Sequence, residues 1–260
     1  MKVLNHEIND FYIKEYYYQS FDDSIENTGI IIDDGCFEYI FIDNRKKNIY
    51  LIHNNKKYNL PNCFTLNHML PPFKFQYDRQ FTTMGIKFQP WVNSLFVPDS
   101  LNSGVIDLTC VYGKELEKTT VSILENFDLN LMISEFDKVL NLKFERVDDE
   151  TNLIQSICFE IHQKNGIISI NELSKKHGIS RQTLNKLFKK KVKYPIKYYS
   201  RLVRTRAAIA YARNNPNLTL TDVSYKYGYF DQSHFINDCK NLIGYNPLLL
   251  IKKEGYSLNK

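Results

Sequence analysis

The chain has 260 residues, of which 43% are hydrophobic and 24% charged, a balance typical of folded globular proteins and not of disordered ones. The five cysteines lie far apart and form no CxxC pair, which argues against a disulfide framework and against a thiolate zinc site. The amino terminus has no apolar run of signal-peptide length, and the apolar runs elsewhere are too short to span a membrane. We therefore expect a cytoplasmic protein with buried thiols.

The charge is divided unevenly along the chain. Residues 1–150 hold 15 basic and 23 acidic side chains, a net charge of −8, whereas residues 151–260 hold 19 and 6, a net charge of +13. Opposite signs predict two domains with different partners, and a basic half is typical of nucleic-acid binding, although a solvated lysine-rich surface has the same composition. The polar segment ERVDDETN at 145–152 lacks apolar periodicity, which predicts domains of 1–148 and 149–260.

The first half favours short β-strands followed by two helices. Aromatic residues recur at every second position in 37–41 and in 73–77, and the polar stretches DNRKKN at 43–48 and HNNKK at 53–57 predict hairpin turns. We expect an antiparallel, cupin-like β barrel with room for a small molecule inside. The segments 112–127 and 129–144 carry apolar residues three and four apart, which predicts two amphipathic helices that cover the barrel or pair with a second subunit.

The first half shows no pattern typical of catalysis or of metal binding. His6, His53 and His68 lack HxH or HExxH spacing, and the sequence has no phosphate-cradling glycine loop, GxSxG elbow or paired-carboxylate motif. We therefore predict no catalytic residue, no metal and no cofactor. The remaining enzymatic alternative is a barrel enzyme that a DNA-binding domain carries to its target.

The second half contains one pattern twice, in SINELSKKHGISRQTLNKLFKK at 169–190 and in TLTDVSYKYGYFDQSHFINDCKN at 219–241. Each copy begins with a hydroxyl residue that suits a helix cap, continues through a short helix, and reaches a glycine, Gly178 or Gly228, that can end this helix in a left-handed conformation. A second helix then starts at Ser180 or at Asp231. Helix, glycine turn and helix is the helix-turn-helix pattern, and two copies in a basic half make it a strong signal.

Residues 151–253 resemble the DNA-binding domain of AraC/XylS-type transcription regulators. The resemblance rests on the two glycine turns, on the connecting segment YSRLVRTRAAIAYAR with its Arg204 and Ala208 spacing, and on the closing run GYFDQSHFINDCKNLIGYNP. Two departures are visible: Cys239 replaces a usual phenylalanine, which predicts a thinner second core, and Lys193 replaces a usual glycine, with Pro195 one residue early, which predicts a changed turn. The first half, with GIKFQPW at 85–91, more loosely resembles the sensor-like domains of such regulators.

The resemblance implies an all-α domain in which a connector helix, expected at 196–213, joins two DNA-reading units. Glutamine and asparagine can pair with adenine, and arginine or lysine with guanine, when a helix lies in the major groove. We expect Gln182, Asn185 and Lys186 to contact base edges, and Arg181 and Ser180 to contact phosphate. The full set of expected DNA-binding residues is Ser180, Arg181, Gln182, Asn185, Lys186, Lys189, Arg204, Gln232, Ser233, His234, Ile236 and Asn237.

The sequence thus predicts an α+β, two-domain transcription regulator whose main partner is double-stranded promoter DNA. The resemblance leaves open RNA polymerase, a second copy of the chain and a small-molecule effector of the first half as further partners, and it implies no membrane partner. An architectural protein that binds DNA with little sequence preference is the other reading. Residues 151–218 hold 14 basic and 2 acidic side chains, against 5 and 4 in residues 219–260, so we expect the first unit to dominate binding.

Overall fold

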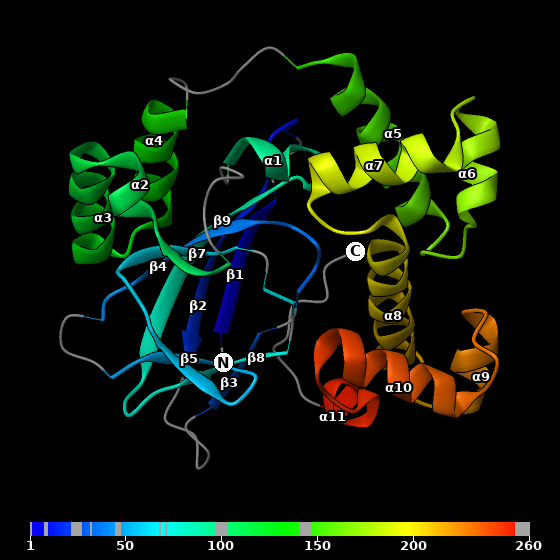
Figure 1. The fold of residues 1–260 in the computed structure, drawn as a ribbon. Coiled ribbons are helices and arrows are strands. Elements are labelled where there is room, and N and C mark those ends of the chain that lie inside the picture. The colour runs from blue at the N-terminus through cyan, green and yellow to red at the C-terminus, as the bar shows by residue number, and fades with distance from the viewer. Residues whose placement is uncertain are drawn as a thin grey trace.

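The computed structural model describes residues 2–7, 10–21, 28–31, 33–44, 48–67, 69–70, 72–96, 103–140 and 147–252. The strands belong to the first half and a group of helices forms the second half (Figure 1), which confirms the α+β class. One antiparallel sheet has the order β1 (Lys2–Glu7), β2 (Ile13–Phe21), β9 (Phe81–Phe88), β4 (Glu38–Ile42), β7 (Cys63–Asn67), β10 (Gly104–Asp107). The other has the order β3 (Thr28–Ile31), β8 (Phe73–Gln76), β5 (Tyr50–His53), β6 (Lys56–Asn59).

The two sheets do not close into the expected barrel. Strand β4 shows the reason, because both of its faces are buried: Ile40 and Ile42 pack between the two sheets, while Tyr39 and Phe41 pack on the helix side of the larger sheet. A sheet that is covered on both faces is stable as an open layer and needs no closure. The expectation of a barrel is therefore corrected to two facing open sheets with helices on the outer face.

Aromatic side chains fill the space between the sheets. Phe21 stacks on Phe81 with ring centroids 4.5 Å apart, and Phe75 and Tyr77 contact the same pair edge to face. Such pairs add to the stabilisation that burial of apolar area provides. Among the described residues, these side chains fill this part of the space between the sheets with the protein's own core.

Of the two expected hairpin turns, one is confirmed and one is wrong. HNNKK joins the paired strands β5 and β6, and Asn54 and Asn55 have φ values of 49° and 60°, the left-handed conformation that a two-residue hairpin needs. DNRKKN instead connects β4 to β5, which lie in different sheets, so it is a crossover between layers. Residues 45–47 within it lie outside the described ranges.

The two amphipathic helices are confirmed as α3 (Lys114–Asn126) and α4 (Leu129–Leu140). Their buried residues, among them Ile123 and Phe136, pack on the outer face of the larger sheet, where the rings of Phe136 and Phe41 lie 5.3 Å apart. Three shorter helices complete this half: η1 (Pro90–Val92), α1 (Asn93–Phe96) and α2 (Leu108–Tyr112). The two helices thus cover the larger sheet, as the first alternative predicted.

The second half is entirely helical in the described residues 147–252, as expected. Its helices are α5 (Asp149–Gln163), α6 (Ile170–Lys176), α7 (Arg181–Val192), α8 (Ile196–Asn214), α9 (Leu220–Lys226), α10 (Gln232–Ile243) and α11 (Pro247–Lys252). Helix α8 is one unbroken helix of 19 residues that runs from the first helix pair to the second (Figure 1). This confirms the expected connector helix.

The two halves share part of their core. Asn93 of α1 donates from its buried amide to the carbonyl oxygens of Gly35 (3.1 Å) and of Val192 at the end of α7 (2.9 Å). The rings of Phe37 and Tyr194 also meet across the boundary, with centroids 6.4 Å apart. Helix α5 begins directly after the predicted boundary at 148 and 149, but independent folding of the two halves stays a prediction.

The expectation that all cysteines are buried holds for four of them. Cys36, Cys63, Cys158 and Cys239 are buried, whereas Cys110 in α2 is exposed and stands as a correction. Cys110 belongs to a short helix whose only buried residue is Leu108, so its thiol faces solvent. All five thiols are free, which agrees with the absence of a disulfide framework.

Candidate DNA-binding surface

The first helix-turn-helix unit is built from local signals in the sequence. Ser169 caps α6 by accepting from the Glu172 backbone N–H (3.1 Å), and the Glu172 carboxylate accepts from the Ser169 N–H (2.8 Å), which completes a capping box. Gly178 then turns the chain with a φ of 65°, and Ser180 caps α7. Buried Leu184 and Phe188 hold α7 on the domain, so the opposite side of this helix faces solvent.

The second unit repeats the same construction. Thr219 and Asp222 form the capping box of α9, Gly228 turns the chain with a φ of 67°, and Asp231 caps α10 by accepting from the His234 N–H (2.7 Å). Phe235 and other buried residues hold α10 on the domain. The repeat that the sequence predicts is thus a repeat of structure, and each unit presents the start of its second helix to solvent.

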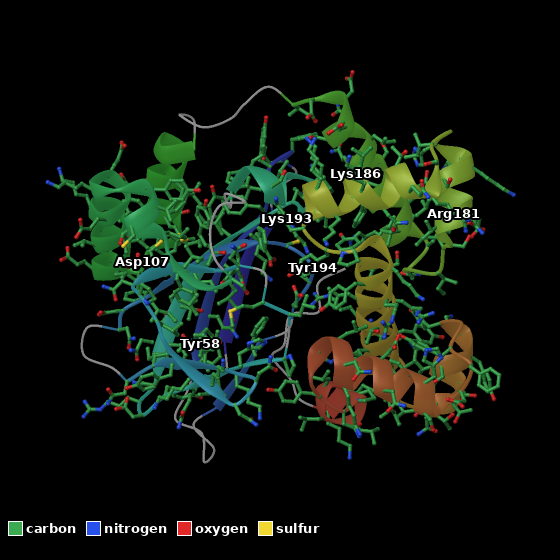
Figure 2. The ribbon with its side chains drawn as sticks, in the orientation of Figure 1. Tyr58, Asp107, Arg181, Lys186, Lys193 and Tyr194 are labelled. Carbon is green, nitrogen blue, oxygen red and sulfur yellow. The ribbon has the colours of Figure 1, made fainter. Side chains whose placement is uncertain are left out.

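The side chains expected to bind DNA on α7 are exposed. Arg181 and Lys186 carry their charges into solvent, and Figure 2 places Arg181 at the start of α7 beside α6, with Lys193 at the opposite end. Asn185 donates to the Arg181 carbonyl (2.8 Å), which leaves its amide oxygen available. Ser180 already uses its hydroxyl as the cap. The exposed residues of this set are Ser180, Arg181, Gln182, Asn185, Lys186 and Lys189.

The corresponding face of α10 is less charged and more constrained. Gln232 accepts the Thr221 hydroxyl with its side-chain oxygen (3.0 Å), so its orientation is fixed relative to α9. Ile236, which is expected either to meet a thymine methyl group or to be partly buried, is half-buried. The exposed residues of this set are Gln232, Ser233, His234 and Asn237.

Arg204 lies elsewhere than the other expected residues. Its Nη2 contacts the buried carboxylate of Asp238 (3.1 Å), and its guanidinium carbon lies 4.1 Å from the centre of the Tyr229 ring. Only 17% of its side chain is exposed, so Arg204 holds α8 against α10 and is not on the exposed face of a DNA-reading helix. Arg201 contacts the same carboxylate (2.6 Å).

A cleft of about 860 Å³ lies between the two units and brings residues of α7, α8 and α10 together. Arg181, Gln182 and Asn185 line it from α7, and His234 lines it from α10. Its α8 side includes Lys197 and Arg201, which the sequence reasoning did not single out. Their spacing of four residues on a helix could have indicated that they share a face.

A second cavity, of about 500 Å³, lies where the two halves meet. Lys14 contacts the buried carboxylate of Asp34 (3.0 Å), and Arg206 donates to the Asp33 carbonyl (3.1 Å). Burial, together with the charges of Lys14 and Arg206, lowers the pKa of His162 to about 4, so this imidazole is neutral at neutral pH. The lining residues are Lys14, Asp34, His162, Asn165, Val203, Arg206, Ala207, Ala210, Tyr211, Asn214, Asn215 and Tyr227.

Within the described residues, no group of three or more His, Cys, Asp or Glu side chains is arranged to hold a metal ion. Within the same ranges, none of the helices combines the length and the apolar character that crossing a membrane requires.

Comparison with known sequences supports the reading of the second half. A family model described as "Helix-turn-helix domain" matches residues 173–252, which include both units and the connector. The Msm operon regulatory protein of Streptococcus mutans serotype c is 29% identical over 127 residues, and the alignment covers 45% of this chain and 45% of that protein. The chain thus matches less than half the length of this curated relative.

Comparison with solved structures concerns the whole fold. A structure of ToxT from Vibrio cholerae aligns with a TM-score of 0.53 at 14% identity, over 92% of this chain and 99% of that chain. ToxT bound to (E)-4-(8-methylnaphthalen-1-yl)but-3-enoic acid aligns with a TM-score of 0.51 at 14% identity, over 91% and 99%. At this identity the likeness indicates a common fold that includes both halves.

Proposed function

Because its second half carries a helix-turn-helix domain of the AraC type, we propose that this protein is a transcription regulator that binds promoter DNA in the cytoplasm. The observation that supports this most directly is the pair of exposed polar helix starts, at Arg181 and at Gln232, joined by the single helix α8. We propose that each helix start enters a major groove, so that two adjacent grooves are read together.

Each unit has side chains suited to reading bases. In α7, Gln182 and Asn185 can each pair with adenine through two hydrogen bonds, and Lys186 can donate to guanine. In α10, Asn237 can read adenine, while the partly buried Ile236 has an apolar edge suited to a thymine methyl group. Arg181 and Lys189 can neutralise phosphates, which gives affinity without sequence preference.

Selection of bound sequences from a random duplex pool at about physiological salt tests this proposal. We expect enrichment of an asymmetric site with two boxes about one helical turn apart, because the two units differ in sequence. A pool that remains random would contradict sequence-specific reading and favour the architectural alternative. Repeating the selection with the Gln182→Ala, Asn185→Ala double variant should remove one box and keep the other.

We also propose that the cavity between the two halves, not the interior of the sheets, receives a small effector. Its volume lies in the range of about 300–1,000 Å³ that is usual for ligand sites, and it touches both the first half and α8. Lys14 and Arg206 lie in its wall beside apolar residues such as Val203. This combination suits a small molecule with a carboxylate and an apolar body, the chemical class of the acid that the ToxT structure contains.

A binding experiment on the full chain tests the effector proposal. Titration calorimetry with a series of aryl and alkyl carboxylic acids should find one that binds the wild type and binds the Arg206→Gln variant about tenfold more weakly. Lys175→Gln, a change in exposed α6 away from the cavity wall, is the matched control for the loss of one positive charge. Equal affinity for both variants would contradict a role for Arg206. Binding to RNA polymerase and to a second copy of the chain, which the family resemblance leaves open, stay predictions.

A further inference from the structure

The connector helix α8 presents a line of polar side chains to the cleft between the two units. Lys197 lies three residues before Ser200 and four before Arg201, and Arg204 follows these two by four and three residues, so all four share one face of the helix and line the cleft. The face follows from the buried positions of α8, since Leu202, Val203 and Ile209 point into the cores on its other sides. The connector is thus more than a spacer, because it forms the floor of an open cleft and brings charged side chains to it.

The cleft carries more positive than negative charge. Arg201 and Arg204 share the buried carboxylate of Asp238, which neutralises one of the two. Lys197 and Arg181 have no ion pair recorded among the described residues, and both are exposed. The Nε of Arg204 is buried without a hydrogen-bond partner within those same residues. The four basic side chains Arg181, Lys197, Arg201 and Arg204, set against the carboxylate of Asp238, give the cleft a formal net charge of +3, with His234 left out of the count.

The position of the cleft between the two units indicates which anionic group it would face when both units are bound to DNA. Two helices that enter successive major grooves on one face of DNA stand on either side of a minor groove, which is bordered by two phosphate backbones. Whatever part of the protein lies between these helices must therefore face those backbones. In this molecule that part is the α8 floor with Lys197 and Arg201.

We propose that the cleft binds the sugar-phosphate backbone of the DNA between the two boxes, with Lys197 and Arg181 in contact with phosphate. Arg201 and Arg204 act as positioning residues, because their bonds to Asp238 hold α10 at a fixed distance from this floor. The inference rests on the proposed function and adds a third point of contact to it, between the two units. Inorganic phosphate could bind the same basic side chains, and competition by inorganic phosphate distinguishes it from the DNA backbone.

The salt dependence of binding tests the proposal, measured with the full chain on its selected duplex between about 50 and 200 mM salt. Loss of one phosphate contact lowers the slope of log affinity against log salt by about 1, or about fourfold in affinity over this range. We expect this reduction for Lys197→Ala and not for Lys118→Ala, which removes the same charge from exposed α3 in the first half.

Neutral phosphates locate the contact. Methylphosphonates placed between the two boxes should weaken wild-type binding more than they weaken the binding of Lys197→Ala, because the variant has already lost one of the two phosphate contacts. Equal slopes for the two variants, or an equal methylphosphonate penalty for wild type and Lys197→Ala, would overturn the inference. Competition by inorganic phosphate beyond that of chloride at equal ionic strength would also overturn it, in favour of a free-anion site.

The test also separates the inference from the function on which it rests. A wild type whose binding shows no salt dependence and no preferred site would overturn the proposed function and the cleft contact together. A wild type with a normal slope and a preferred site, whose two lysine variants behave alike, would overturn the cleft contact alone.

Discussion

Lys193 is a single residue that holds an unfavourable backbone conformation. It ends α7 with a φ of 68°, in the left-handed region where the Cβ atom of an L-residue clashes with the backbone. The AraC resemblance leads one to expect glycine here, and the lysine accepts the same conformation at an energetic cost. The next residues, Tyr194 and Pro195, then lead directly into α8.

We predict that Lys193→Gly raises the free energy of unfolding by about 1 kcal/mol, because relief of the left-handed strain outweighs the larger entropy of glycine in the unfolded chain. Denaturant unfolding followed by circular dichroism measures the change. Lys189→Gly, inside α7 with an ordinary helical conformation, should instead lower stability by up to about 1 kcal/mol. If neither variant is more stable than the wild type, or if both are, the left-handed backbone conformation of Lys193 does not explain the result.

His162 makes stability depend on pH through its buried imidazole. Its pKa falls from 6.5 to about 4 on folding, because burial and the nearby Lys14 and Arg206 disfavour the charged form, while Asp34 partly opposes them. The unfolded chain therefore binds more protons between these values. The stability contributed by the neutral imidazole is complete above pH 6.5 and is lost as the pH falls toward 4.

We predict that this loss amounts to about 2 kcal/mol at pH 5 relative to pH 7. The His162 imidazole bonds to the Tyr199 hydroxyl (2.9 Å), and a glutamine can keep this hydrogen bond without titrating. The His162→Gln variant should therefore not show this loss of stability between pH 7 and pH 5. Comparing wild type and variant at each pH is necessary, because burial also raises the pKa of Asp33 to about 6 and of Glu38 to about 7, and these shifts stabilise the fold as the pH falls. Unfolding curves whose difference does not change with pH would contradict the assignment to His162.

At the scale of elements, the helices of the second half could be predicted because their signals are local. Caps, glycine turns and apolar spacing all lie within a few residues of each helix, and the starts at Ser180 and Asp231 agree with the structure. The apolar spacing in 112–127 predicts that Val121 and Leu124 both point inward, and this is wrong for Val121, which is 41% exposed, while Ile123 is fully buried.

The sheets could be predicted only in part, since strand pairing depends on residues far apart in the sequence. Strands β2 and β9 lie side by side with about sixty residues between them, and neither β1, β2 nor β10 was anticipated. The alternation in 37–41 correctly indicated a strand, but both of its faces are buried, which a half-exposed barrel strand would not show. For this reason the barrel expectation failed while the strands themselves were found.

The two reading helices differ in charge, and this predicts unequal contributions to binding. Lys186 of α7 is an exposed cation, whereas Asn237 of α10 is neutral and follows a helix start that contains Asp231. Because neutralisation of phosphate supplies much of the affinity, we predict that Lys186→Ala weakens binding more than Asn237→Ala does, by roughly 1 kcal/mol or more. Titration of a labelled duplex at fixed salt measures both, and similar losses would refute the asymmetry.

At the scale of the whole molecule, the length of α8 constrains the DNA. Its 19 residues span about 28 Å, at about 1.5 Å per residue, whereas successive major grooves on one face are about 34 Å apart. If α8 stays straight, full entry of both helices favours DNA bent toward the protein, at a cost of about 1–6 kcal/mol.

We predict that gel mobility of the complex depends on where the site lies within circularly permuted fragments. Uniform mobility, which indicates straight DNA, would count against simultaneous engagement of both grooves by a rigid connector. Insertion of two glycines in the middle of α8 should reduce the bend and the affinity together, since it uncouples the two units. A matched insertion in the polar segment at 215–218, after α8 ends, should change neither.

The contacts between the halves were not accessible from the sequence. Contacts within the second half were also hidden: the charge of Arg204 suggested DNA, but this side chain packs on the ring of Tyr229 and contacts the carboxylate of Asp238. The cavity between the halves and the core shared with α7 depend on the packing of two segments that lie far apart in the sequence. Composition predicted two halves of opposite charge, and only the structure brings Asn93 to the end of α7.

That contact has a consequence during protein synthesis. Asp33, which accepts from Arg206, precedes its partner by 173 residues, and Asn93 precedes Val192 by 99. At about 5–20 residues per second, the ribosome completes the first of these pairs about 9–35 s after Asp33 is made. Phe37 and Trp91 are made well before α5 and α7, so until these helices are synthesised both side chains lack part of the surface that buries them in the finished fold. The nascent first half therefore exposes apolar surface until the second half arrives to cover it.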